Sequence, residues 1–146
     1  AEGYPEFSPD GRWLAYGSDE TGRDEVFVQP YPGPGKRVQI SMGGGNEPAW
    51  SRNGKELFYR SVEGSMLSVR FTASNAEFIP EKPVVLFTWN FATGGIARLY
   101  DVGPDGRFLT LQAIPNATAE WNKKFFPSAI RIVLNWTEDL PKIVKR

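Results

Sequence analysis

The chain has 146 residues, with 17 basic and 17 acidic side chains and neither Cys nor His. This length suits one domain with a buried core, so we expect residues 1–146 to form a single domain. The neutral charge balance argues against a nucleic-acid partner or a polybasic membrane patch, and no apolar run approaches the roughly 18 residues of a membrane span. Without Cys and His, the sequence excludes a Ser-His-Asp triad, a Cys nucleophile and a zinc site built on His or thiolate.

The first predicted element is a hairpin at FSPDGRWLAY, residues 7–16. An apolar residue ends one strand, and Pro9-Asp10-Gly11 makes the turn. The Asp side chain can bond its own backbone, and Gly takes the positive φ that follows. A basic residue then leads into a strand of bulky side chains.

The same pattern returns twice, as WSRNGKELFY at residues 50–59 and as VGPDGRFLTL at residues 102–111. The interval is about 40 to 50 residues, which is typical of β-propeller blades. Further strands are expected after each hairpin, giving four, four and three strands in the three units. These further strands are predicted at residues 25–29, 37–41, 66–70, 83–87 and 130–134.

An aromatic residue followed by Ser-Pro-Asp-Gly resembles the TolB-like (WD40-like) propeller repeats of bacteria. The ending IRIVLNWTEDLPKIV is similar to the C-terminal blade and tail of such propellers. The resemblance implies an all-β half propeller, equivalent to the C-terminal three blades of a six-bladed ring. The expected blades are residues 4–41, 45–88 and 97–136, each four-stranded except the last, which lacks one strand, with a tail at 137–146. The resemblance also implies a soluble bacterial protein, either cytoplasmic or periplasmic.

A three-bladed arc would leave two blade faces open. Large apolar patches usually mark interfaces, so we expect a homodimer that completes the six-bladed ring. A complex with a separate N-terminal half and a collapsed monomer are the alternatives. The bulky strand residues expected on such faces are Trp13, Tyr16, Phe58, Tyr59, Phe108 and Leu111.

Propellers bind ligands at the mouth of the central channel, where the first strand of each blade begins. The side chains expected to meet a small-molecule ligand there are Tyr4, Glu6, Asn46, Tyr100 and Trp121. The loop that carries Trp121 has two alternative positions, over the channel or against the outer surface.

Asn46 and Glu47 form the most suggestive pair, because an amide and a carboxylate suit calcium or another divalent cation. Glu47 would then assist water as the catalytic carboxylate, and Arg98 would orient an anionic ligand. The alternatives are structural. Asn46 and Glu47 would cap the Gly43–Gly45 turn, and Arg98 would pair with a carboxylate such as Glu47.

Two functions therefore stay open. The first is a non-catalytic binding or scaffold module. The second is a metal-dependent hydrolase of esters, lactones or phosphotriesters, which resembles the calcium-dependent propeller hydrolases in architecture only. The absence of His favours the first.

Overall fold

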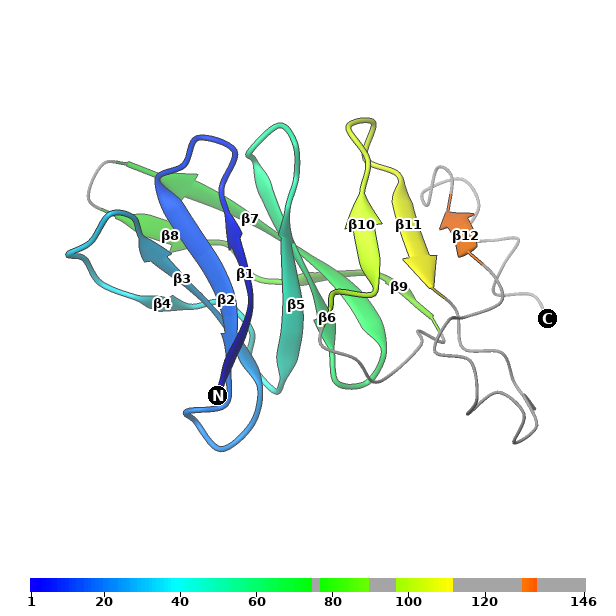
Figure 1. Cartoon of the computed structure of the whole chain (residues 1–146), viewed down its shortest axis with the longest axis horizontal. Coiled ribbons are helices and arrows are strands. Elements are labelled where there is room, and N and C mark those ends of the chain that lie inside the picture. Colours follow the sequence, from blue (N-terminus) through cyan, green and yellow to red (C-terminus); the bar gives the residue numbers. More distant parts are fainter. Residues whose placement is uncertain (75–76, 90–96, 112–129, 134–146) are drawn as a thin grey trace.

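The computed structural model describes residues 1–74, 77–89 and 97–111, and the backbone of 130–133. The described residues form twelve strands in three antiparallel sheets and no helix, so the all-β prediction is confirmed (Figure 1). No stretch within these residues makes a helix with the length and hydropathy that a bilayer crossing requires. The expected tail at 137–146 lies outside the described residues.

The first sheet is a meander of four strands in the order β1-β2-β3-β4. Its strands are β1 (Glu2–Phe7), β2 (Trp13–Ser18), β3 (Glu25–Pro30) and β4 (Val38–Gln39). The strands predicted at 25–29 and 37–41 are present, although β4 contains two residues. Strand β2 alternates between the two faces of the sheet: Trp13 and Ala15 join the core, whereas Leu14 and Tyr16 point to the opposite face.

The second sheet has five strands where the sequence predicted four. They are β5 (Gly45–Trp50), β6 (Glu56–Ser61), β7 (Ser65–Ala73), β8 (Phe78–Pro80) and β9 (Val84–Thr88). The extra strand exists because β7 is nine residues long and has two partners on its outer edge. Its first half pairs with β9, and its second half pairs with β8.

The third sheet is formed by β10 (Tyr100–Val102), β11 (Phe108–Leu111) and β12 (Ile130–Val133). Three strands in this unit agree with the sequence prediction. Strands β1, β5 and β10 are the first strands of their sheets. They lie next to one another in that order and run in the same direction (Figure 1).

The repeated turns have the predicted chemistry. Asp10 Oδ1 accepts the Ser8 hydroxyl at 2.6 Å and the Arg12 amide at 3.1 Å. Asn53 Oδ1 does the same for the Ser51 hydroxyl at 2.8 Å and the Lys55 amide at 3.0 Å. The glycine after each of these residues has a positive φ, 70° at Gly11 and 67° at Gly54, which a side chain with a Cβ rarely adopts.

Two apolar layers hold the three sheets together. One layer lies between the first and second sheets and includes Trp13, Trp50 and Tyr59. The other lies between the second and third sheets and includes Phe58 and Phe108. All five side chains are buried within the single chain. The expectation that Trp13, Phe58, Tyr59 and Phe108 form exposed end faces was therefore wrong.

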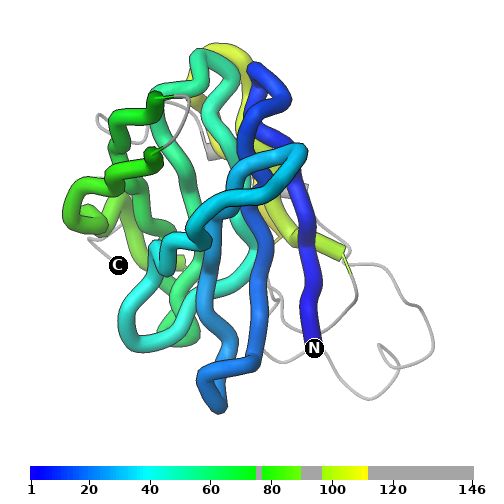
Figure 2. The backbone as a smooth tube through the Cα atoms, turned by 90° about the vertical axis from the view of Figure 1, so that its left-hand side faces the viewer, coloured from blue at the N-terminus to red at the C-terminus, as the bar shows by residue number. Residues whose placement is uncertain are grey.

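The chain itself covers part of the outer face of the first sheet. The loop of residues 31–37 crosses in front of this sheet in Figure 2. Its last residue, Arg37, lies 4.5 Å from the centre of the Phe27 ring and donates to Glu20 at 2.7 Å. Phe27 in turn stacks on Tyr16, which is buried although the sequence placed it on an open face. Leu111 is half-buried.

Candidate functional site at the first strands of the three sheets

Two residues of the first strands have an unusual backbone. Tyr4 in β1 and Glu47 in β5 have φ values of 55° and 56°, and they are the non-glycine residues with positive φ in the described chain. Each precedes a proline and lies where the strand pairing shifts register, between Gly3 and Glu6 in β1 and between Asn46 and Ala49 in β5. Such strained bulges re-aim side chains and concentrate at functional positions, so this strand edge is the candidate site.

Glu47 is buried, with 2% of its surface exposed. Its Oε1 forms an ion pair with Arg60 Nη2 at 2.6 Å, and its Oε2 accepts the backbone amide of Leu99 at 3.0 Å. Both carboxylate oxygens are therefore engaged by donors from β6 and from the segment that precedes β10. Glu47 joins the second sheet to the third.

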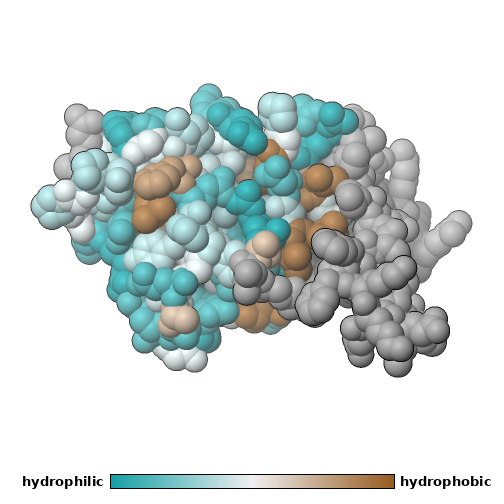
Figure 3. Space-filling model, viewed as in Figure 1, coloured by the Kyte–Doolittle hydropathy of each residue, from teal (hydrophilic) through white to brown (hydrophobic). Residues whose placement is uncertain are grey.

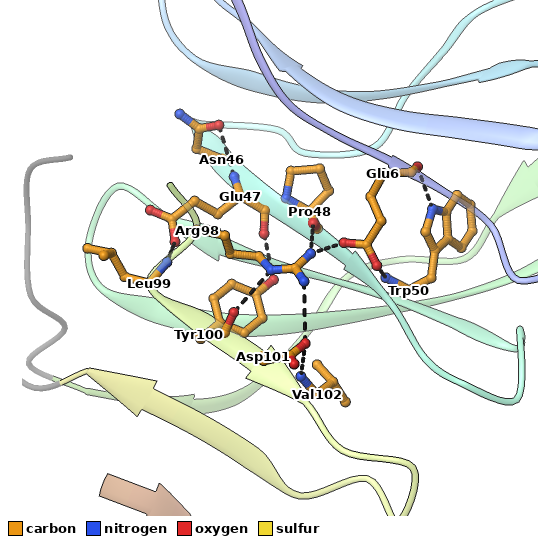
Figure 4. Close-up of polar contacts among 10 residues, drawn as sticks. All are labelled: Glu6, Asn46, Glu47, Pro48, Trp50, Arg98, Leu99, Tyr100, Asp101 and Val102. Carbon is orange, nitrogen blue, oxygen red and sulfur yellow. Dashed lines mark hydrogen bonds and ion pairs between the residues drawn. The ribbon is translucent and has the colours of Figure 1, made fainter. Parts of the chain in front are cut away.

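Arg98 lies at the centre of the site (Figure 4). Its guanidinium donates to the carbonyl oxygens of Pro48 and Tyr100, each at 3.0 Å. It also forms ion pairs with Glu6 in β1 and with Asp101 in β10. The sequence named Glu47 as an example of a carboxylate partner for Arg98, but Glu47 pairs with Arg60. One planar side chain thus contacts the first strands of all three sheets.

Tyr100 was expected to meet a ligand, but its side chain is buried. Its hydroxyl donates to the backbone carbonyl oxygen of Glu47 at 2.5 Å, and Arg98 lies 5.5 Å from the centre of its ring. Burial raises the pKa of the Tyr100 phenol well above its usual range. The hydroxyl therefore serves as a fixed donor within the site.

Asn46 points away from this centre, toward the first sheet. Its Nδ2 donates to Asp24 Oδ2 at 2.9 Å, and its Oδ1 accepts the amide of Glu47 at 2.9 Å. The side chain packs against Gly17, where an added Cβ would come within 2.3 Å of Asn46 Oδ1. Asn46 is thus committed to positioning the second sheet against the first.

The cap of the Gly43–Gly45 turn is a residue that the sequence analysis missed. Glu25, at the start of β3, is buried, and its Oε1 accepts the amides of Gly43 at 3.2 Å and Gly44 at 3.0 Å. It also accepts from Arg23 Nε at 2.7 Å and from the Ser41 hydroxyl. The available signal was the run of three glycines, whose free amides require an acceptor.

Glu6 lies at the boundary between the first two sheets and contacts residues of the other sheets. Its backbone carbonyl oxygen accepts Trp50 Nε1 at 3.0 Å, while its carboxylate contacts Arg98. Tyr4 is half-buried in the same strand. The structure therefore gathers Tyr4, Glu6, Asn46, Glu47, Arg98 and Tyr100 along one edge, whereas Trp121 lies outside the described residues.

A calcium ion does not fit this arrangement well. Calcium requires six to eight oxygen ligands, yet the oxygens of Glu47 and Asn46 already accept protein donors. Within the described ranges, no three acidic side chains gather as a metal-binding group. The arrangement holds three sheets in register instead of presenting free ligands.

Comparison of the chain with protein-family models and with curated protein sequences found no match. The functional argument therefore rests on the geometry described above.

Proposed function

We propose that this chain is a non-catalytic binding or scaffold module of the propeller type, in which the three sheets are blades around a common axis. The observation that carries the proposal is the position of Arg98, whose guanidinium contacts β1, β5 and the backbone of β10. First strands that lie side by side and run in one direction are what a propeller axis requires. The repeated Asp-Gly and Asn-Gly turns support the same architecture.

The contacts within the site favour binding over catalysis. A hydrolase of the calcium type would need Glu47 and Asn46 to bind the metal and a carboxylate to activate water. In this structure both side chains hold sheets together. Among the groups that remain accessible are Glu6, Arg98 and Asp101, a mixed-charge set suited to orienting a small polar ligand at the channel mouth.

We further propose that a second copy of the chain completes the ring. The outer face of the first sheet carries Phe7 and Tyr31, whose rings lie 4.7 Å apart and are about half exposed. The same face contains a hollow of about 360 Å³ lined in part by Leu14 and Tyr16. On the third sheet, Leu109 is exposed on the face turned away from the core.

Figure 3 agrees with this placement, with apolar surface over β2 and again over β10 and β11. In a two-fold ring the first sheet of one copy would meet the third sheet of the other. Both apolar ends would then be buried.

The test is the mass in solution, measured by size exclusion with light scattering. We expect about twice the chain mass of 16.3 kDa. The double variant Phe7→Ser/Tyr31→Ser should shift the mass toward the monomer. Val84→Ser/Val85→Ser, which changes two exposed side chains on β9, is the matched control and should leave the dimer intact. A wild-type monomer at high concentration would refute ring completion by a second copy.

The proposal that the chain is not a catalyst is tested by a separate hydrolysis assay. We expect no turnover of activated esters, lactones or phosphotriesters, with or without calcium. Calcium-dependent hydrolysis that disappears in Glu47→Gln would contradict the proposal and restore the hydrolase alternative.

A further inference from the structure

A second pocket lies away from the first strands, at the end of the molecule where the β1–β2 and β5–β6 turns meet. It has a volume of about 400 Å³ and is bordered by both turns and by the last part of β7, including Phe71. The pocket exists because β7 continues past its pairing with β6 and approaches the β1–β2 turn (Figure 1). Its volume falls within the range of about 300–1,000 Å³ that is typical of small-molecule sites.

The two turns have the same backbone chemistry and different charge. In the first turn, Arg12 Nε pairs with Asp10 Oδ2 at 2.8 Å, so acid and base balance. In the second turn, Asn53 makes the same local hydrogen bonds as Asp10 but carries no charge. Lys55, the counterpart of Arg12, therefore has no turn carboxylate to pair with.

The second turn also gains a cation. Arg52 occupies the position that Pro9 holds in the first turn, so SPDGR becomes SRNGK. Turn geometry does not require a basic residue there, because proline serves at the equivalent position. Among the described residues, neither Arg52 nor Lys55 forms an ion pair with a carboxylate. The pocket lining thus has three cationic side chains and one carboxylate, Asp10.

Aromatic side chains supply part of the pocket wall. Trp13 and Phe71 both border the pocket, next to the basic turn residues. Trp13 is buried, and its Nε1–H has no acceptor in the part of the chain that the structure describes. A buried donor without a partner is costly and rare in folded proteins, and Trp13 is a lining residue of this pocket that has one.

We propose that this pocket binds a small phosphate monoester that carries a flat apolar ring. The dianionic phosphate lies against Arg52 and Lys55, since two uncompensated cations match two negative charges. The ring contacts Trp13 and Phe71. The site is formed within one chain, so it does not depend on completion of the ring by a second copy.

The test is calorimetric titration of the full chain with phenyl phosphate, inorganic phosphate and phenol at millimolar concentrations. We expect phenyl phosphate to bind more tightly than inorganic phosphate, and phenol not to bind. Raising the salt concentration should weaken the binding of both phosphates. Equal affinity for phenyl phosphate and inorganic phosphate would overturn the ring contact, and no binding of either would overturn the site.

Two double variants each remove two positive charges, one pair at the pocket and the other pair elsewhere on the surface. Arg52→Gln/Lys55→Gln should lower the affinity for phenyl phosphate at least tenfold. Lys36→Gln/Lys82→Gln, which changes exposed lysines outside this pocket, should leave it unchanged. Both pairs are on the surface, so circular dichroism should show a folded chain in each case. If the Arg52/Lys55 variant binds like wild type, or both variants lose affinity equally, the proposed site is wrong.

Discussion

Arg98 and Glu6 form an ion pair between the segment that enters the third sheet and the first strand of the first sheet. The same guanidinium donates to the carbonyl oxygen of Pro48 at 3.0 Å, in the strand that lies between them. A single side chain therefore connects three sheets whose apolar layers are otherwise separate. Four predictions concern this connection, the carboxylates of Glu25 and Asp10, and the buried phenols.

Replacing Arg98 with Met should destabilise the fold by about 1–3 kcal/mol, because Glu6 and two backbone carbonyl oxygens lose a charged donor. Urea unfolding monitored by tryptophan fluorescence measures this loss. The control is Arg70→Met, whose side chain is 74% exposed and makes a 3.3 Å contact with Glu56. That surface ion pair should contribute less than about 0.5 kcal/mol. Equal losses in the two variants would show that Arg98 does not connect the sheets energetically.

Glu25→Gln should lower the free energy of unfolding by about 2–3 kcal/mol. The buried carboxylate accepts four donors, and the NH₂ group of a glutamine would face some of those donors without being able to accept from them. The amides of Gly43 and Gly44 should exchange with solvent faster in this variant, as measured by NMR. Glu63→Gln, at an exposed turn position, is the control and should change stability by less than about 0.5 kcal/mol. Unchanged exchange at both glycines would mean that Glu25 does not hold this turn.

Asp10 should make the fold sensitive to acid. The hydrogen bond from the Ser8 hydroxyl, followed by donation from the Arg12 amide and guanidinium, lowers the pKa of Asp10 to about 2. The unfolded value is about 3.9. A lowered pKa stabilises the folded state above about pH 4, and that contribution is lost as the pH falls toward 2.

Asp10→Asn tests this effect, because Asn53 shows that an amide supports the same turn. The thermal midpoint of wild type should exceed that of the variant slightly at pH 5 to 7. The difference should shrink between pH 4 and pH 2. A difference that stays constant over this range would contradict the assignment to Asp10.

Tyr100 should contribute to sensitivity at high pH. Burial raises its pKa, and burial likewise raises the pKa of Tyr59 to about 12. In the unfolded chain a phenol ionises near pH 10. Because the folded state keeps both phenols neutral, stability is complete below about pH 10 and falls as the pH rises above it.

At pH 7 the variant Tyr100→Phe should be less stable to unfolding than wild type by about 1 kcal/mol, because the 2.5 Å hydrogen bond to the Glu47 carbonyl oxygen is removed. Above pH 10 the gap between wild type and variant should narrow, since the variant lacks one ionising phenol. Urea unfolding between pH 7 and pH 11 measures both effects. A gap that widens above pH 10 would show that the buried hydroxyl ionises readily in the folded state.

The secondary structure was largely predictable because its causes are local. Asp10-Gly11 and Asn53-Gly54 encode turns within a few residues, and alternation along the strands separates a core face from an outer face. The strand β8 escaped prediction because its existence depends on how far β7 extends beyond β6. That length is a property of the pairing between strands and is not visible in either segment alone.

For the candidate site, too, the sequence predicted one part and the tertiary structure decided the other. Sequence position was enough to bring Tyr4, Glu6, Asn46, Glu47, Arg98 and Tyr100 to one edge, since each lies at or next to the start of a first strand. The pairing of carboxylates with cations was decided by the tertiary structure. Glu47 pairs with Arg60 and Arg98 pairs with Glu6. Glu25 caps the glycine turn, which the structural alternative had assigned to Asn46 and Glu47.

The physical reason is distance along the chain. A turn or a strand is determined by interactions within a few residues, so the sequence by itself determined the all-β class and the repeated hairpins. An ion pair between β1 and the entrance to β10 forms only after three sheets have packed through Trp50, Phe58 and Phe108. Packing of the sheets brings Glu6 next to Arg98, and the pairing of β5 with β6 brings Glu47 next to Arg60, although the members of each pair are far apart or on different strands in the sequence.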